Sequence, residues 1–298
     1  MNMKLMALGA ATDLPLSALT SFRIGGSADY VLRPRSYGNI ADALRVCTEA
    51  KLPVFVLGRG SNILASDGGF RGLILRLDTP LAPVEIIGTR ILCCAFTPLS
   101  ELCRKSVEAG LMGLERLAGI PGSVGGAVAM NAGAYGGEIK QVLRSVFILK
   151  DGQMRWVPVS DGDMGYRHSR FSYPDCIVLQ AELQLQPDDG SAERVMRECL
   201  QARKEKQPLE YPSAGSVFKR PPGLFAGQLI EECGLKGYSI GGAQVSEKHA
   251  GFIINAGNAT QAEVSALIAY IQNTVAARKG VSLHCEIKRL TEDGTCIS

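Results

Sequence analysis

The chain has 298 residues, of which 46% are hydrophobic and 20% charged, and its net charge is +3. This length is too great for one small core and predicts two domains, or one domain with an added lobe. The composition is that of an ordinary globular protein, and the small net charge argues against a nucleic-acid-binding protein, which needs a strongly basic surface.

Cysteine and histidine usage indicates a reducing compartment. The nine cysteines contain no C-x-x-C pair, and the three histidines do not have the spacing of metal ligands. We therefore expect free thiols rather than disulfides or a metal site. The N-terminal apolar run is only about seven residues long before Thr12, at the lower limit for a signal peptide. The sequence thus predicts a cytoplasmic protein.

The first part of the chain contains a glycine turn directly after a strand. Strands are expected at 28–33, 53–58 and 72–77 and a helix at 38–51. The strand at 53–58 runs into Gly58-x-Gly60-x-x-Ile63, which lacks the third glycine of a dinucleotide fingerprint and is followed by no helix. This argues against a conventional Rossmann unit. Backbone amides and the side chains of Ser61 and Asn62 nevertheless suit phosphate oxygens.

The stretch Gly119–Gly137, GIPGSVGGAVAMNAGAYGG, contains seven glycines and no charge. Glycine allows backbone N–H groups to approach a ligand closely, and Ser123 and Asn131 add polar side chains. Interleaved apolar residues favour a loop anchored on a core over a flexible linker, and Pro121 and the glycines argue against a membrane span. Together the two glycine-rich segments could hold the two phosphates of one dinucleotide from opposite sides.

The remaining elements predict a mixed α+β fold without internal repeats. Strands are expected near 84–87 and 90–95, a helix near 98–109, a hairpin turning at Asp151-Gly152, and a strand at 176–186. Asp188-Asp189-Gly190 is the expected domain boundary. Beyond it we expect a helix near 191–205, a loop at 207–223, a helix near 224–233, a strand at 251–255, an amphipathic helix at 261–279 and a strand at 282–290.

Three further segments contain candidate functional side chains. Residues 166–171, YRHSRF, place two arginines around a histidine, and arginine binds carboxylates and phosphates through paired hydrogen bonds; a solvated surface loop is the alternative. Small residues around Ser216 leave space for a ligand beside Lys219, although a serine that only caps a turn is the favoured alternative. Glu286 is either a solvated strand residue or a positioned acid. The residues alone leave these alternatives open.

A resemblance to a known family favours the functional interpretation of each of these segments. The segments SFRIGG, LGRGSNIL, GIPGSVGGAVAMNAGAYGG, YRHSRF, AGSVFKRP, GFIINAG and HCEIKRL occur in this order, and the chain resembles the UDP-N-acetylenolpyruvoylglucosamine reductases, flavoenzymes that make UDP-N-acetylmuramate for peptidoglycan. The resemblance implies an FAD-binding domain of the vanillyl-alcohol-oxidase type at 1–187, with lobes at about 1–78 and 79–187. It also implies a substrate-binding domain at 188–298, whose C-terminal end returns to pack on the first lobe.

The same resemblance implies the reaction and its residues. NADPH reduces non-covalently bound FAD, which then passes a hydride to C3 of the enolpyruvyl group of a UDP-sugar. Arg167 and Glu286 act on the enolpyruvyl carboxylate, and Ser216 protonates C2. Tyr166, Lys206 and Lys219 are implied substrate contacts, and no nucleic acid or membrane insertion is expected. A monomer is favoured, although the sequence leaves the oligomeric state open.

Residues in the two glycine-rich segments are the expected FAD contacts. They are Leu57, Gly58, Gly60, Ser61, Asn62, Ile63, Ile120, Pro121, Gly122, Ser123, Gly125, Gly126, Asn131, Gly133, Ala134 and Tyr135. The chain is short and lacks an extra tyrosine-bearing loop found in some relatives, so it resembles the compact subtype. The alternatives are another FAD-dependent oxidoreductase of the same fold and a nucleotide-binding protein that has lost its chemistry.

Overall fold

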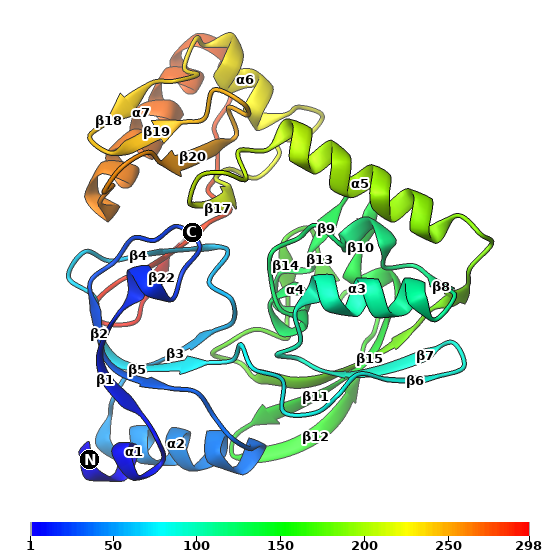
Figure 1. Cartoon of the computed structure of the whole chain (residues 1–298). Coiled ribbons are helices and arrows are strands. Elements are labelled where there is room, and N and C mark those ends of the chain that lie inside the picture. The colour runs from blue at the N-terminus through cyan, green and yellow to red at the C-terminus, as the bar shows by residue number, and fades with distance from the viewer. Residues whose placement is uncertain (1, 298) are drawn as a thin grey trace. The chain divides into compact units, whose positions relative to one another are not determined.

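A computed structural model describes residues 2–297 of the chain and forms two compact units (Figure 1). The first unit contains the described residues up to Ala11, Val31–Arg59 and Ile74–Arg203. The second contains Thr12–Tyr30, Gly60–Leu73 and the described residues from Lys204 onward. Each unit has both helices and strands, which confirms the predicted α+β class.

The first unit contains a five-stranded antiparallel sheet with the order β12-β11-β15-β7-β6. Its strands are β6 (Glu85–Ile87), β7 (Arg90–Cys94), β11 (Leu143–Lys150), β12 (Gln153–Pro158) and β15 (Ile177–Gln184). The hairpin between β11 and β12 turns at Asp151 and Gly152, which have φ values of 51° and 73°. Positive φ at both central residues is the requirement of a type I′ turn, and the predicted hairpin is confirmed.

Helices α3 (Leu99–Glu108) and α4 (Val124–Met130) lie near this sheet, as Figure 1 shows. Helix α3 matches the prediction, and its buried residues include Leu99, Leu102 and Cys103. Helix α4 was expected to be part of an irregular glycine loop, and that expectation is wrong. The buried residues Val124, Ala127 and Val128 have helical spacing. The two glycines within the helix hide this signal in the sequence, because each glycine disfavours a helix by about 1 kcal/mol relative to alanine.

Helix α2 (Tyr37–Ala50) begins at Ser36, whose hydroxyl accepts the amide of Asn39, and it ends at Lys51 in the left-handed conformation. These caps explain why the observed bounds of α2 lie within one residue of the predicted ones.

A further sheet has the order β1-β2-β5-β3. Its strands are β1 (Ala11–Pro15), β2 (Ser27–Leu32), β3 (Val54–Leu57) and β5 (Phe70–Arg76).

The second unit contains a four-stranded sheet with the order β17-β20-β19-β18. Its strands are β17 (Ser213–Ser216), β18 (Ser239–Ile240), β19 (Ala243–Val245) and β20 (Phe252–Asn255). Helices α6 (Ala226–Glu232) and α7 (Gln261–Lys279) bury their apolar faces in the core of this unit. A capping box of Thr260 and Glu263 begins α7 and Gly280 ends it, so the predicted range is confirmed.

Strand β17 lies in the range that the sequence predicted to be a loop. Its residues are small and show no alternation of apolar and polar side chains, so only its pairing with β20 makes it a strand. The predicted strand at 282–290 is wrong in part, because only Lys288–Leu290 forms β21. That strand pairs in parallel with β4 (Ile63–Ala65) and antiparallel with β22 (Cys296–Ile297).

The remaining elements are short or peripheral. They are helices α1 (Asn2–Ala7) and α5 (Ala192–Lys206), the 3₁₀ turns Leu16–Ala18, Glu115–Leu117 and Ile139–Gln141, and strands β8 (Leu111–Met112), β9 (Gly133–Ala134), β10 (Gly137–Glu138), β13 (Met164–Gly165), β14 (His168–Ser169) and β16 (Gln186–Pro187). Within residues 2–297, no helix is long and apolar enough to cross a bilayer.

Candidate active site

Close packing of two predicted cofactor residues joins the glycine-rich segments within the first unit. A Cβ atom added to Gly58 would lie 2.8 Å from the Ser123 hydroxyl oxygen. The Ser123 hydroxyl itself accepts the amide of Gly126 at 3.3 Å and thereby begins helix α4. Gly125 packs on Ala95, whose carbonyl oxygen accepts its amide at 2.7 Å. The end of β3 and the start of α4 are therefore neighbours, as one shared ligand requires.

The turn after Gly58 is held by backbone contacts in the second unit. Gly60 has a φ of 68°, and a Cβ atom there would lie 2.5 Å from the carbonyl oxygen of Leu19. The Asn62 side chain donates to the carbonyl oxygen of Glu286 at 3.2 Å, and the Asn62 carbonyl oxygen accepts the amide of Lys288 at 2.9 Å. Asn62 thus attaches the turn to the segment that contains Glu286.

The C-terminal half of the glycine-rich stretch holds the loop that carries Arg167. Asn131 is completely buried with a φ of 43°, and its side-chain amide donates to Glu138 at 3.1 Å and to the Gly165 carbonyl oxygen at 2.9 Å. The Gly133 carbonyl oxygen accepts a guanidinium N–H of Arg167 at 3.3 Å. Asn131 therefore has a structural function in the protein that its sequence context did not reveal.

Arg167 occupies a tight turn between β13 and β14. Met164 pairs with Ser169 and Gly165 with His168, so Tyr166 and Arg167 are the two turn residues. Arg167 has a φ of 53°, and its guanidinium carbon lies 5.1 Å from the centre of the Tyr166 ring. A non-glycine residue with positive φ is uncommon and costs about 1–2 kcal/mol. The surrounding contacts outweigh this cost and fix the direction of the arginine.

Ser216 and Glu286 lie on neighbouring segments of the second unit. Phe218 and Cys285 form a β-bridge, so Val217 lies opposite Glu286 and its carbonyl oxygen accepts the Glu286 amide at 2.7 Å. The Lys219 amide donates to the His284 carbonyl oxygen at 2.8 Å. The structure therefore brings together three residues that the sequence singled out separately, namely Ser216, Lys219 and Glu286.

Lys206 is the exposed last residue of α5. Eight of the cysteines are free and buried. Burial raises the pKa of the Cys47 and Cys176 thiols to about 11 and that of Cys103 to about 12, so these thiols stay protonated and unreactive at neutral pH.

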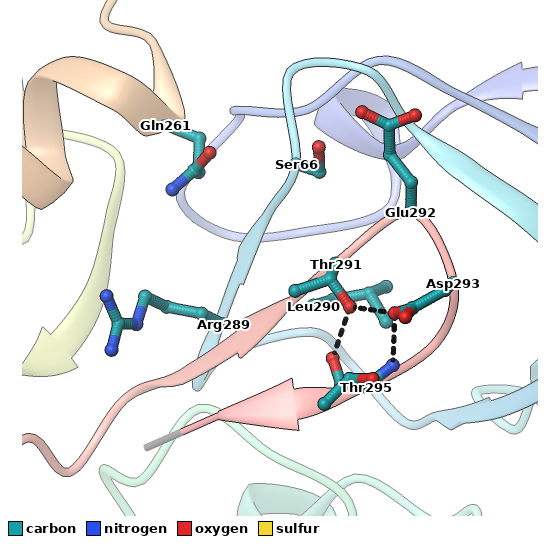
Figure 2. A pocket seen from close by; sticks show the side chains of 8 residues that line it. All are labelled: Ser66, Gln261, Arg289, Leu290, Thr291, Glu292, Asp293 and Thr295. Atoms are coloured by element: carbon teal, nitrogen blue, oxygen red, sulfur yellow. Dashed lines mark hydrogen bonds between the residues drawn. The ribbon is translucent and has the colours of Figure 1, made fainter.

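A separate hollow of about 580 Å³ lies in the second unit (Figure 2). Its lining is Ser66, Gln261, Arg289, Leu290, Thr291, Glu292, Asp293 and Thr295. Hydrogen bonds from Thr291 and from Thr295 lower the pKa of Asp293 to about 2, and Figure 2 shows Arg289 extending away from that turn. None of the sequence-predicted site residues lines this hollow, so it is not the candidate active site.

Comparisons with known proteins identify the family. The model described as "UDP-N-acetylenolpyruvoylglucosamine reductase, C-terminal domain" matches residues 207–290, and a model of an FAD-binding domain matches residues 28–158. A protein named UDP-N-acetylenolpyruvoylglucosamine reductase from Clostridium botulinum (strain Hall) is 44% identical over 284 residues, which cover 94% of this chain and 92% of the relative. The chain belongs to this reductase family.

Two further relatives support the assignment. A UDP-N-acetylenolpyruvoylglucosamine reductase from Agathobacter rectalis is 45% identical over 97% of this chain and 96% of its own length. The crystal structure of the reductase from Thermus caldophilus is 34% identical, with a TM-score of 0.78 over 93% of this chain and 97% of that one. The predicted reductase family, its fold and its FAD-binding domain are confirmed.

The residues of this reductase fit the FAD that the family binds. The buried hydroxyl groups of Thr20 and Thr97 have no hydrogen-bond partner among the described residues. Thr20 adjoins Gly60, and the Thr97 carbonyl oxygen accepts the Val124 amide at 2.9 Å. An unsatisfied buried hydroxyl costs about 1–3 kcal/mol, so each glycine-rich segment has a donor suited to a polar ligand. Neither threonine could be predicted from the sequence, because a single threonine forms no motif.

Proposed function

We propose that this chain reduces UDP-N-acetylglucosamine enolpyruvate to UDP-N-acetylmuramate with NADPH, as a step of peptidoglycan precursor synthesis. Membership of the reductase family supports the reaction, and the pairing of Val217 with Glu286 supports the assignment of its residues. Bound FAD supplies the hydride exchange between NADPH and the enolpyruvyl group. The protein supplies binding, orientation and a proton.

Ser216 donates the proton to C2 of the substrate. A serine hydroxyl is a very weak acid in water, but a carbanion-like C2 is far more basic, so the position of the hydroxyl matters more than its acidity. Ser216 is exposed and follows Gly215, which has a φ of 80°. Its backbone lies between two fixed points, since Ser216 pairs with Phe252 and Val217 with Glu286. This arrangement suits a donor that must be held in one place.

Arg167 and Glu286 act on the enolpyruvyl carboxylate. Negative charge spreads from C2 into this carboxylate during the reaction, and a fixed guanidinium stabilises it where it develops. The left-handed turn and the hydrogen bond to Gly133 hold Arg167 in place before substrate binds. The backbone of Glu286 is held by Val217 and Asn62. Tyr166, Lys206 and Lys219 are the proposed contacts to the rest of the UDP-sugar.

The proposed organisation assigns residues 1–187 to FAD and 188–298 to the substrate. FAD contacts are drawn from the two glycine-rich segments, residues 57–63 and 120–135, in which the close approach of Gly58 to Ser123 supports a shared ligand. The shortness of the chain supports the compact subtype without a tyrosine loop. We further propose a cytoplasmic monomer, in keeping with its buried free thiols.

An anaerobic absorbance experiment tests the function. The purified protein should show an oxidised flavin spectrum that NADPH bleaches, and the enolpyruvyl substrate should restore it. Bleaching without restoration would indicate a different acceptor and hence another flavin oxidoreductase. Absence of flavin, not corrected by added FAD, would contradict the assignment of the glycine-rich segments. A Ser216→Ala variant that restores the spectrum as fast as the wild type would contradict the proton-donor role.

A further inference from the structure

The turn between β19 and β20 is built around His249. The Ser246 hydroxyl, which is 1% exposed, accepts the amides of Lys248 at 3.2 Å and His249 at 3.3 Å. The His249 carbonyl oxygen accepts the Phe252 amide at 2.9 Å, and the Ser246 amide donates to the Phe252 carbonyl oxygen at 3.0 Å. These bonds close a compact turn in which the imidazole has a defined place.

The His249 imidazole accepts a hydrogen bond from the backbone of the same turn. Its Nδ1 atom lies 3.0 Å from the amide nitrogen of Gly251. An acceptor side chain bonded to the amide two residues later is the arrangement that asparagine and aspartate use in an Asx turn. Because Nδ1 accepts, the ring is neutral and its proton is on Nε2.

Two glycines make room for this ring. A Cβ atom added to Gly227 of α6 would lie 3.1 Å from the Cε1 atom of His249, and one added to Gly251 would lie 2.9 Å from it. The ring also packs edge-on against Phe252, with 5.1 Å between ring centres. The half-buried imidazole is therefore flanked by α6 and by the first residue of β20.

The residues that His249 contacts are those that hold the Ser216 segment. The Gly251 carbonyl oxygen accepts the Val217 amide at 2.9 Å, and Phe252 pairs with Ser216 across the sheet. Gly251 is thus bonded at its amide to His249 and at its carbonyl to Val217. From this chain of contacts we propose that neutral His249 is a positioning residue that holds β20 in the geometry placing Ser216 for proton donation.

This inference rests on the proposed role of Ser216 and adds a dependence on pH. Burial is the main cause that lowers the pKa of His249; a hydrogen bond with its own backbone raises this pKa, the charge of Lys236 lowers it and that of Glu231 raises it. Lys236 and Glu231 pair with each other at 2.7 Å, so their effects on the ring partly cancel. Protonation of Nδ1 removes the acceptor for Gly251, so β20 loses this constraint in acid.

Two substitutions distinguish the effect of the hydrogen-bond acceptor of His249 from the effect of its side-chain size. His249→Asn places an amide oxygen where Nδ1 lies and can reform the bond to Gly251 without titrating. His249→Gln is closer in length to histidine but places its amide one bond too far from Gly251. We expect His249→Gln to slow substrate-dependent flavin reoxidation about 10- to 100-fold, as small misplacements of reacting groups do. NADPH-dependent bleaching should change less than twofold.

The second test compares how the rate of flavin reoxidation depends on pH in the wild type and in His249→Asn. Wild-type reoxidation should slow only as the pH falls below about 6.5 toward the lowered pKa of His249, whereas His249→Asn should keep the wild-type rate at pH 7.5 and lose most of this acid dependence. Equal rates for His249→Gln and His249→Asn would overturn the inference. So would an equal loss in both half-reactions of His249→Gln, because that would indicate general damage.

A spectroscopic readout separates this inference from the proposed function. Selective ¹⁵N-histidine labelling of the FAD-loaded protein reports the tautomer of each of three rings. We expect one ring with an unprotonated, hydrogen-bonded Nδ1 at pH 7.5, and its signal should vanish in His249→Gln. A protonated Nδ1 would overturn this inference while leaving Ser216 as donor. An unaffected Ser216→Ala variant, in contrast, would overturn the donor role while the NMR signal persists.

Discussion

The two regions that carry the proposed catalytic residues are held in different ways. Ser216 and Glu286 lie on paired segments of the second unit, where backbone pairing with Phe252 and Val217 and a hydrogen bond from the Asn62 side chain fix the chain. Arg167 lies in the first unit in a two-residue turn, with a left-handed backbone and a guanidinium bonded to Gly133. The Ser216–Glu286 region is thus held mainly by backbone hydrogen bonds, whereas the Arg167 turn depends in addition on the side chains of Arg167 and Asn131.

This difference predicts how each region tolerates substitution. Where the backbone holds the site, a side chain can be removed with little structural effect, so the functional loss reports chemistry. Where side chains hold the site, a substitution at a supporting residue changes both stability and activity. Four predictions test this contrast, beginning with the largest expected effect.

The first prediction concerns the proton donor. Ser216→Ala should slow substrate-dependent flavin reoxidation by about 10²–10⁴-fold, the usual contribution of a positioned acid, while the unfolding free energy stays within about 0.5 kcal/mol. Stopped-flow absorbance and urea unfolding measure the two effects. Ser213→Ala in the same strand is the control and should retain the wild-type rate. A matching loss in both variants would assign the effect to the strand rather than to the hydroxyl.

The second prediction concerns the guanidinium. Arg167→Lys keeps the charge and the cost of positive φ but loses the planar fork, so kcat should fall by about 10²–10³-fold, and loss of the hydrogen bond to Gly133 should lower the unfolding free energy by about 1 kcal/mol. Steady-state kinetics with varied enolpyruvyl substrate checks it. Arg170→Lys is the control, because Arg170 is exposed and pairs with Asp163 at 2.7 Å. If Arg167→Lys altered KM alone, Arg167 would serve binding rather than the transition state.

The third prediction concerns the support of the Arg167 turn. Asn131→Ala should reduce the unfolding free energy by about 1–3 kcal/mol, because the half-buried Glu138 and Gly165 lose hydrogen bonds worth about 0.5–1.5 kcal/mol each. Asn258→Ala is the control, since Asn258 also has positive φ but is exposed, and it should cost about 1 kcal/mol. Similar urea midpoints for both variants would contradict a structural role for the Asn131 side chain.

The fourth and smallest prediction concerns pH and stability. Burial lowers the pKa of His249 below its unfolded value of about 6.5. The neutral ring therefore contributes stability above pH 6.5, and this contribution is lost as the pH falls toward the folded-state pKa. Between pH 7.5 and 5.5 the wild type should lose more unfolding free energy than His249→Asn. Parallel losses in thermal or urea unfolding would show that other groups account for the dependence.

Elements with a clear local signal could be predicted from the sequence. The bounds of α7 follow from its apolar period and its capping residues, and the β11–β12 hairpin follows from Asp151-Gly152. Strand β17 and helix α4 were missed for the opposite reason. Their small residues and glycines carry little propensity, and partners far along the chain decide their structure.

The candidate site likewise contains residues that could be predicted from the sequence and residues that could not. Arg167, Ser216 and Glu286 could be singled out because they lie in motifs shared with a reductase family, and their assignment stays a prediction until variants are measured. His249, Thr20 and Thr97 could not be found in this way. Each acts through a contact that only the folded chain creates, such as the bond from Gly251 to Nδ1, and a lone histidine or threonine has no periodic or spacing signal.

The pairing of β4 with β21 has a consequence for biosynthesis. The Asn62 side chain donates to Glu286, which is 224 residues away in the sequence, and β4 lies parallel to β21. Because translation proceeds at about 5–20 residues per second, on the order of 10–45 s pass between the synthesis of β4 and the synthesis of its partner strand β21. During that time its edge is unpaired and open to association with other nascent chains. The second unit therefore completes its fold only after Lys288–Leu290 has been synthesised, and a chain cut short before Glu286 would leave Ser216 without that neighbour.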